Sequence, residues 1–227
     1  MHITIFSQIS IDGKLTMGAG KSSKPLFSFF NQSDITYIHK FRGAVDAIMV
    51  GKNTILTDNP FLTNRVEENK NPVRIIPTKT FDLPMDANVL TDDGRTIVVT
   101  TEQGYQEEKA QILRERGKEC IVCGEDQVNF RQLFLQLEEQ YGMKRVMVEG
   151  GGQLNWHIFN EDLANDIILM QLPIIIGGHD NVTLVDGDGY TELALTKQYK
   201  VVELDQKENY TLMRFVKLQA NMQTEAV

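Results

Sequence analysis

The chain has 227 residues, of which 41% are hydrophobic and 24% charged, and its formal net charge at pH 7 is −8. These values are typical of one soluble globular domain with a substantial core, and the negative charge disfavours non-specific binding to nucleic acid or to an anionic membrane. No apolar run is long enough to cross a membrane, and the first residues lack a basic region followed by a cleavage site, so we expect a cytoplasmic protein.

Short β-branched runs alternate with helical patterns along almost the whole chain. Helices are predicted after a cap at Ser33, over 105–116 before Gly117, and over 130–141 between Asn129 and Gly142. The alternation predicts an α/β fold with a mostly parallel central sheet flanked by helices, and its last two strands form an antiparallel hairpin. We expect one domain over 1–218 and a polar tail over 219–227. Strands are predicted at 2–9, 45–50, 73–77, 96–101, 119–123, 144–148, 166–173, 199–205 and 209–217.

The two cysteines, Cys120 and Cys123, have the C-x-x-C spacing of some redox and zinc sites. They fall in a predicted strand, where positions three apart face opposite sides of the sheet. No second cysteine pair or nearby histidine completes a metal site, and the four histidines show no ligand spacing. We therefore predict two reduced thiols and no metal.

Glycines follow three predicted strands: Gly51, the run 150–152 after Glu149, and the pair 177–178. In a parallel sheet, ligands bind at the carboxyl ends of the strands, where glycine lets the backbone approach them. The free N–H groups of a helix that begins there attract an anion such as a phosphate. The run is not a G-x-G-x-x-G motif, so a standard dinucleotide fold is not implied, and a plain tight turn is the structural alternative. Trp156, in the helix after this run, is expected to pack in the core.

Five segments in order resemble the motifs of the pyrimidine reductases of riboflavin biosynthesis, over roughly residues 3 to 180. Ser10-Ile11-Asp12-Gly13-Lys14 is similar to their S-x-D-G-K/R opening. The other four segments are 50–65 (VGKNTILTDNPFLTNR), 71–76 (NPVRII), the Glu149 block and 172–178 (LPIIIGG). The resemblance implies a dihydrofolate-reductase-like fold, a homodimer, and NADPH-dependent reduction of a ribosylaminopyrimidine 5′-phosphate to its ribitylamino product.

The resemblance also implies site residues. Thr54 and Asp58 would hold the cofactor, although a helix cap and a turn residue are the plainer interpretations of these two. Lys14 would help to protonate the reacting centre or reach the base carbonyl, and a solvated loop lysine is equally compatible with its position. Backbone groups of Gly150, Gly151, Gly152, Gln153 and Leu154 would contact the cofactor pyrophosphate, and Ser22, Arg42, Leu62, Arg65 and Glu149 would contact the substrate.

Two of these substrate contacts have a physical basis as well. Arg42 and Arg65 could bind a phosphate in bidentate fashion, although an arginine at a helix end also interacts favourably with the helix dipole. An acid such as Glu149 at the end of a buried strand needs partners, and ribose hydroxyls or pyrimidine N–H groups are suitable. Asp12 before Gly13 is most simply a turn former.

Thr78 and Lys79 stand where the family usually has an aspartate and a serine, and Asn59 replaces a second aspartate. The H-x-E and P-C-x-x-C signature of a zinc deaminase is absent, so we expect a stand-alone reductase. Two alternatives stay open: a reductase of the same fold that acts on another small molecule, and a nucleotide-binding protein without turnover. Whether the substrate is the deaminated or the diamino pyrimidine is also open.

Overall fold

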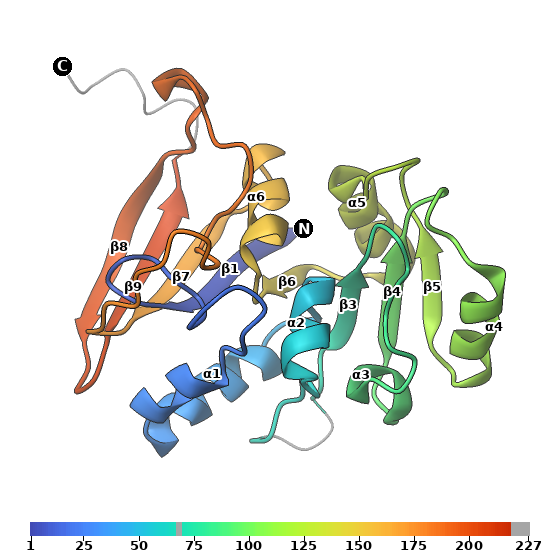
Figure 1. Ribbon diagram of the computed structural model, residues 1–227, viewed down its shortest axis with the longest axis horizontal. Coiled ribbons are helices and arrows are strands. Elements are labelled where there is room, and N and C mark those ends of the chain that lie inside the picture. Colours follow the sequence, from blue (N-terminus) through green and yellow to red (C-terminus); the bar gives the residue numbers. More distant parts are fainter. Residues whose placement is uncertain (67–69, 219–227) are drawn as a thin grey trace.

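One sheet of nine strands forms the centre of the protein (Figure 1). The computed structural model describes residues 1–66 and 70–218, so the predicted tail at 219–227 lies outside the described residues. The order across the sheet is β5-β4-β3-β2-β6-β1-β7-β9-β8. The strands are β1 (His2–Ile9), β2 (Ala47–Met49), β3 (Val73–Pro77), β4 (Thr96–Thr100), β5 (Glu119–Val122), β6 (Arg145–Val148), β7 (Asp166–Gln171), β8 (Tyr199–Gln206) and β9 (Thr211–Lys217).

All nine predicted strands are present, with ends within two residues of the prediction, and the predicted sheet type is confirmed. Strands β1 to β7 pair in parallel, whereas β9 pairs antiparallel with both β7 and β8. The chain turns back between β8 and β9 at 207–210, where Lys207 donates its N–H to the Tyr210 carbonyl at 2.9 Å. The C-terminal hairpin therefore lies at the sheet edge, with β8 outermost.

The predicted helices are present, but one cap is wrong, α4 begins two residues later than predicted, and the short segments η1, α3 and η2 were not predicted. The helix α1 (Gln32–Gly43) begins after Asn31, whose side chain accepts from the N–H groups of Ser33 and Asp34, while the Asp34 carboxylate accepts from the Asn31 N–H. The predicted cap at Ser33 is wrong because Asn31 forms this reciprocal capping box two residues earlier. The remaining helices are η1 (Lys24–Phe29), α2 (Lys52–Asp58), α3 (Asn88–Thr91), α4 (Glu107–Glu115), α5 (Phe130–Tyr141), α6 (Gly152–Asn160) and η2 (Leu193–Leu195).

Three predicted helix boundaries are confirmed. Asn129 caps α5 by accepting from the Gln132 N–H, and Gly142 closes that helix in the left-handed conformation, with φ 68°. Gly117, just beyond α4, has φ 67°. Glycine adopts this conformation without the steric strain of a Cβ atom, which is why it ends helices so often.

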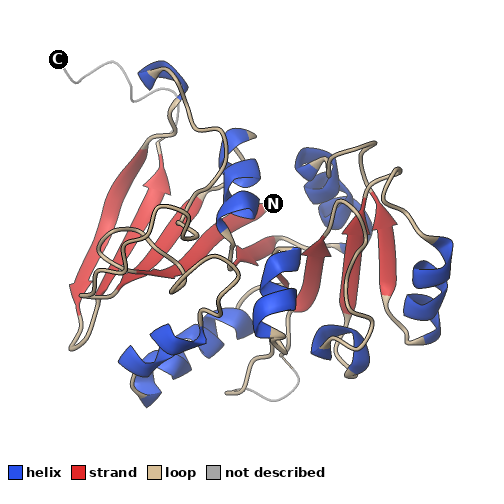
Figure 2. Cartoon of the chain, in the orientation of Figure 1, coloured by secondary structure: helices blue, strands red, loops and turns tan. Residues whose placement is uncertain are grey.

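Helices cover both faces of the sheet (Figure 2). On one face, buried side chains of α1, α2, α3 and α4 pack with Phe6 of β1 and Met147 of β6. On the other face, α5 and α6 pack on side chains such as Ile5 and Val148. This alternation of odd and even positions along β1 is the period-2 pattern of a strand buried on both sides.

The cysteines follow the same alternation. Cys120 packs against the first core and Cys123 belongs to the second, and both are free thiols. Burial raises the pKa of both thiols, that of Cys120 to about 11. The two thiols face opposite sides of the sheet as predicted, although Cys123 lies just after the end of β5 and not within the strand. Within the described ranges no group of histidine, cysteine, aspartate and glutamate side chains has the geometry to hold a metal ion.

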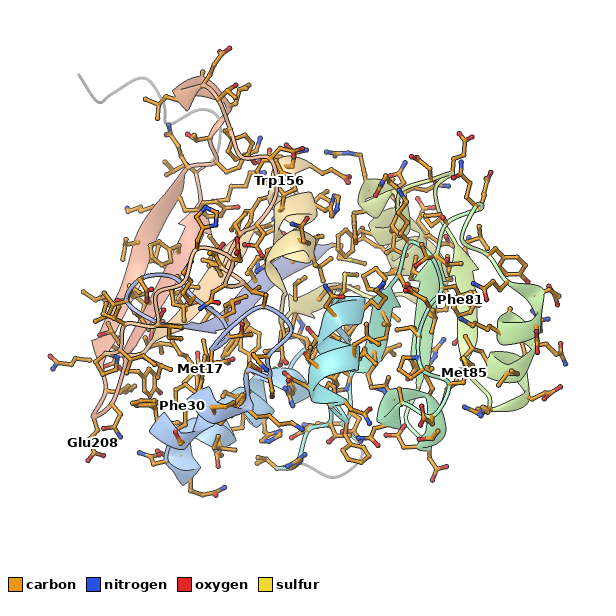
Figure 3. The ribbon with its side chains drawn as sticks, in the orientation of Figure 1. Met17, Phe30, Phe81, Met85, Trp156 and Glu208 are labelled. Carbon is orange, nitrogen blue, oxygen red and sulfur yellow. The ribbon has the colours of Figure 1, made fainter. Side chains whose placement is uncertain are left out.

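Trp156 differs from prediction. It lies on α6 (Figure 3) and is only partly buried. Its ring packs against that of Tyr190, with centroids 5.0 Å apart, and belongs to none of the core clusters. The loop around Gly187 passes so close to the indole that a Cβ atom at that glycine would overlap the ring. No helix in the part of the chain that the structure describes is both long and apolar enough to cross a bilayer.

Candidate active site

The carboxyl ends of β2, β3 and β6 meet beside a cavity of about 1080 Å³. The pairing of β2 with both other strands sets this arrangement, and the Gly51 N–H donates to the Gly150 carbonyl at 3.0 Å. A volume at or above the upper end of single-ligand pockets suits two ligands side by side. The predicted site residues that line the cavity are Arg42, Thr54, Asp58, Leu62, Arg65, Glu149, Gly151, Gly152, Gln153 and Leu154.

Arg42 and Glu149 form a bidentate ion pair at this edge. Nε and Nη2 of Arg42, at the last turn of α1, each donate to a Glu149 carboxylate oxygen at 2.7 Å. The side chains are 13% and 15% exposed, and burial opposes the Arg42 charge, but the Glu149 carboxylate outweighs burial and raises the pKa of Arg42. Glu149 therefore has a protein partner already, where the sequence suggested ligand hydroxyls.

The loop after α2 brings two further predicted residues to the cavity. Leu62 is 3% exposed and has φ 54°, a left-handed conformation that is rare for leucine and turns the chain sharply. Arg74 of β3 donates to the Phe61 carbonyl at 3.1 Å, which links this loop to the sheet. Arg65 is exposed and makes no hydrogen bond or ion pair with the described residues. Its guanidinium is thus without a partner among the residues that the structure describes.

Thr54 and Asp58 lie on α2 and line the cavity. Asp58 is 8% exposed; its Oδ2 accepts from the Ser23 hydroxyl at 2.8 Å, and its Oδ1 has no partner among the described residues. Asn59 ends the helix with φ 40°, and asparagine tolerates this conformation better than most residues do. The Asn59 side chain also accepts from the Asn88 N–H at 2.8 Å. Asn59, which stands where the family usually has an aspartate, thus has a structural role beside the cavity.

The glycine turn leads into α6 as expected. Gly151 is the N-cap and provides no side-chain cap, and the N–H groups of residues 152–154 have no acceptor among the described residues. A Cβ atom at Gly151 would meet nothing within 4 Å, whereas one at Gly152 would overlap the Asp186 carboxylate. The uncapped helix start is suited to an anion, and of these two glycines only Gly151 has open space on its Cβ side.

Three predicted site residues do not line the cavity: Lys14, Ser22 and Gly150. Lys14 forms a β-bridge with Thr183, and the neighbouring Leu15 and Thr16 line the wall instead. Ser22 accepts from the Lys24 N–H at 3.1 Å. Their roles stay predictions. The glycines at 177–178 are also absent from the lining, so two of the three glycine junctions meet at the cavity.

Asp12 does more than form a turn. It accepts from the Ser10 hydroxyl at 2.6 Å, from the Ile176 N–H at 3.1 Å and from the Gly177 N–H at 2.7 Å. The Ser10 hydroxyl and then these amides lower the pKa of Asp12 to about 2. Asp12 thus joins the opening motif to the loop after β7.

Sequence reasoning missed several residues that line the cavity. His39 lies one turn before Arg42 on α1, and this i, i+3 spacing could have indicated it. Thr78 and Lys79, noted only as departures, follow β3 into the cavity, and the Thr78 hydroxyl is buried without a partner among the described residues. Ser7 of β1 is 3% exposed with an unpartnered hydroxyl in that same part of the chain. Asp186 comes from a loop with no motif to mark it.

The RibD C-terminal domain family model matches residues 1–212. The chain is 44% identical over 193 residues to a 2,5-diamino-6-ribosylamino-4(3H)-pyrimidinone 5′-phosphate reductase of Aquifex aeolicus, covering 85% of each chain. It is 34% identical over 216 residues to the protein of the same name from Methanothermobacter thermautotrophicus, covering 93% of each.

Solved structures show the same fold. Acinetobacter baumannii RibD superposes with a TM-score of 0.79 at 20% identity, over 96% of this chain and 58% of that one. The chain thus spans somewhat more than half of that protein's length. A Saccharomyces riboflavin biosynthesis reductase superposes with a TM-score of 0.67 at 19% identity, over 96% of this chain and 90% of that one.

Proposed function

Because the chain belongs to the RibD C-terminal domain family, we propose that it is an NADPH-dependent reductase of 2,5-diamino-6-ribosylamino-4(3H)-pyrimidinone 5′-phosphate in riboflavin biosynthesis. The diamino form is favoured because the relatives at 44% and 34% identity carry that name. One observation carries the proposal: a single cavity contains an uncapped, glycine-lined helix start and, on other elements, an ion pair with a free arginine. These two features suit a dinucleotide and a phosphorylated sugar.

The residues present fit a nicotinamide dinucleotide. The start of α6 offers backbone donors to a pyrophosphate, and Asp58 Oδ1 and the Thr78 hydroxyl are buried polar atoms that lack a partner in the described chain. When bound, the nicotinamide supplies a hydride to the C1′ carbon of the substrate's open-chain or imine form. The protein then has to hold that carbon in place and keep water away from it.

The choice of NADPH over NADH depends on a cation for the extra phosphate. Lys52 and Lys79 both line the cavity, and Lys79 directly follows Thr78 in the chain. Lys52 is paired with Asp82 at 2.8 Å, while Lys79 makes no side-chain hydrogen bond or ion pair with the residues described. We expect Lys79→Ala to weaken NADPH binding about tenfold and NADH binding hardly at all, because a hydrogen bond to a charged group contributes about 1.5 kcal/mol or more. Equal losses for both cofactors would argue against this role.

On the substrate side, the Arg65 guanidinium has no partner among the described residues, and the Arg42–Glu149 pair offers hydrogen-bonding groups to the sugar or the base. Lys14 remains the proposed proton donor. If it acts on the reacting centre, Lys14→Met should lower kcat while leaving the dissociation constants of both ligands nearly unchanged. The homodimer stays a prediction that sedimentation equilibrium can check.

The decisive experiment follows NADPH oxidation with the diamino substrate, its deaminated form and dihydrofolate. Oxidation with the diamino form supports the proposal. Oxidation with dihydrofolate alone would favour a reductase for another small molecule, and cofactor binding without oxidation would favour a protein without turnover. Arg65→Ala should raise the Michaelis constant for the pyrimidine far more than that for NADPH, and equal effects would contradict the phosphate assignment.

A further inference from the structure

His39 lies in the substrate half of the cavity and has no role in the function proposed so far. Its side chain lines the cavity, and the residue is only 8% exposed. His39 Nδ1 is 3.0 Å from the Thr63 carbonyl oxygen, and Arg42 Nη1 donates to the same oxygen at 3.3 Å. The imidazole is therefore held beside the Arg42–Glu149 pair by the loop that also presents Arg65.

The hydrogen bond fixes which ring nitrogen a ligand meets. A carbonyl oxygen can only accept, so Nδ1 carries the proton in this contact. Nε2 makes no hydrogen bond to any residue that the structure describes. In the neutral ring Nε2 is an acceptor, and it becomes a donor only when the ring takes up a second proton.

Charged groups from three elements surround the ring. Burial lowers the pKa of His39 most, and the positive charges of Arg42 and, less strongly, Arg65 lower it further. The hydrogen bond with Thr63 and the charge of Glu149 act in the opposite direction. The net direction is downward, which favours the neutral imidazole in the free protein. A phosphate dianion beside Arg65 would reverse this balance, because an opposite charge within about 4–6 Å favours the protonated ring.

We propose that His39 binds the phosphate of the substrate through Nε2, and that it takes up one proton from solvent as the phosphate enters. The inference rests on the proposed function for the identity of the substrate. It adds a second phosphate-binding group to Arg65, at a point where Arg42 is already occupied by Glu149. It also predicts that substrate affinity falls between about pH 6 and 8, as the proton becomes harder to supply.

Two substitutions separate binding from a purely structural role. The amide nitrogen of His39→Asn can take the place of Nδ1 and keep the bond to Thr63, but nothing then stands at Nε2. The His39→Gln amide extends to the Nε2 position and donates a hydrogen bond without any change of charge. The matched control is His179→Gln, because that imidazole is 98% exposed and, among the described residues, forms a hydrogen bond or ion pair with Asp180 alone.

The test is calorimetric titration of the phosphorylated diamino substrate into the NADP⁺-saturated protein at pH 7, in two buffers of different ionisation enthalpy. Protonation changes of the phosphate itself are common to all variants, so the difference between wild type and variant isolates His39. We expect wild type and His179→Gln to take up more protons than either position-39 variant. We expect His39→Asn to bind roughly tenfold more weakly with unchanged thermal unfolding, because a charged hydrogen bond is lost.

Equal proton uptake in wild type, His39→Asn and His39→Gln would overturn the proposal. This holds even if both variants bind more weakly, since His39 would then contribute to binding without taking up a proton. If His39→Asn fails to fold, His39→Gln provides the same comparison. Failure of the proposed function is seen separately, as a wild-type protein that oxidises no NADPH with either pyrimidine.

Discussion

Breaking the Arg42–Glu149 pair should destabilise the protein more than removing it altogether. The carboxylate accepts two charge-assisted hydrogen bonds at 2.7 Å, and the two side chains are 13% and 15% exposed. Removing one partner of a buried pair leaves an uncompensated charge and costs about 3–5 kcal/mol. Replacing both partners with apolar side chains of similar size is often close to neutral. We therefore expect a free energy of unfolding about 3 kcal/mol lower for Arg42→Met or Glu149→Met, and a smaller loss for the double variant.

The assay is a double-mutant cycle by urea unfolding at pH 7, with the slope on denaturant checked for constancy across the four proteins. A coupling energy of roughly 2–4 kcal/mol is expected from the single-variant losses. Additive single losses, with coupling below about 0.5 kcal/mol, would refute the conclusion that the pair acts as a unit. The surface pair Lys52–Asp82, with Asp82 54% exposed, is a matched control that should show a coupling of about 1 kcal/mol or less.

Three other predictions follow from particular contacts. Gly151→Ala should weaken NADPH binding with little loss of stability, since a Cβ atom there meets only open space. Gly152→Ala should reduce both NADPH affinity and stability, since its Cβ atom overlaps the Asp186 carboxylate. Equal stabilities of the two variants in chemical unfolding would contradict this difference. The pKa of Asp12 is lowered to about 2, so its contribution to stability is present above about pH 4 and is lost as the pH falls toward 2. The melting temperature of Asp12→Asn should therefore depend less on pH over this range than that of the wild type. The same pH dependence in both proteins would count against this role of Asp12. Arg74 donates two hydrogen bonds to the Asp92 carboxylate from a site 1% exposed, so Arg74→Met should lower the free energy of unfolding by about 3–5 kcal/mol, and a urea midpoint like that of the wild type would exclude this.

The sequence predicted elements whose signals are local. Most strands are apolar β-branched runs, and the one at 144–148 is followed by Glu149 and three glycines, where the chain leaves the sheet. The α5 helix shows its cap, its apolar stripe and its closing glycine within a few residues, so both ends were predicted correctly. The sequence pattern predicts the α1 cap two residues late, because asparagine and serine are both favourable cap residues. The reciprocal hydrogen bonds between Asn31 and Asp34 fix the cap at Asn31 and not at Ser33.

The site residues likewise fall into two groups, those with a local sequence signal and those brought to the cavity by tertiary packing. Thr54, Glu149 and Gly151 follow strands, and a parallel sheet brings such positions to one edge, so they could be predicted. His39 and Asp186 reach the cavity through the packing of a helix and a loop, which no local pattern encodes. The path of the 59–65 loop depends on left-handed residues at Asn59 and Leu62, and a leucine gives no signal for that conformation. The cavity walls contributed by tertiary packing therefore became visible only in the folded chain.

The Arg42–Glu149 pair also decides which group can hold a phosphate. If Arg42 turned to the ligand, Glu149 would lose its partner inside the protein, which costs about 3–5 kcal/mol. A new bidentate contact would have to offset that loss before it contributed any affinity. Arg65 is exposed and free of partners among the described residues, so it can bind without such a loss. Substrate affinity should thus fall more for Arg65→Ala than for Arg42→Lys measured on folded protein, and the reverse order would mean that the pair opens when substrate binds.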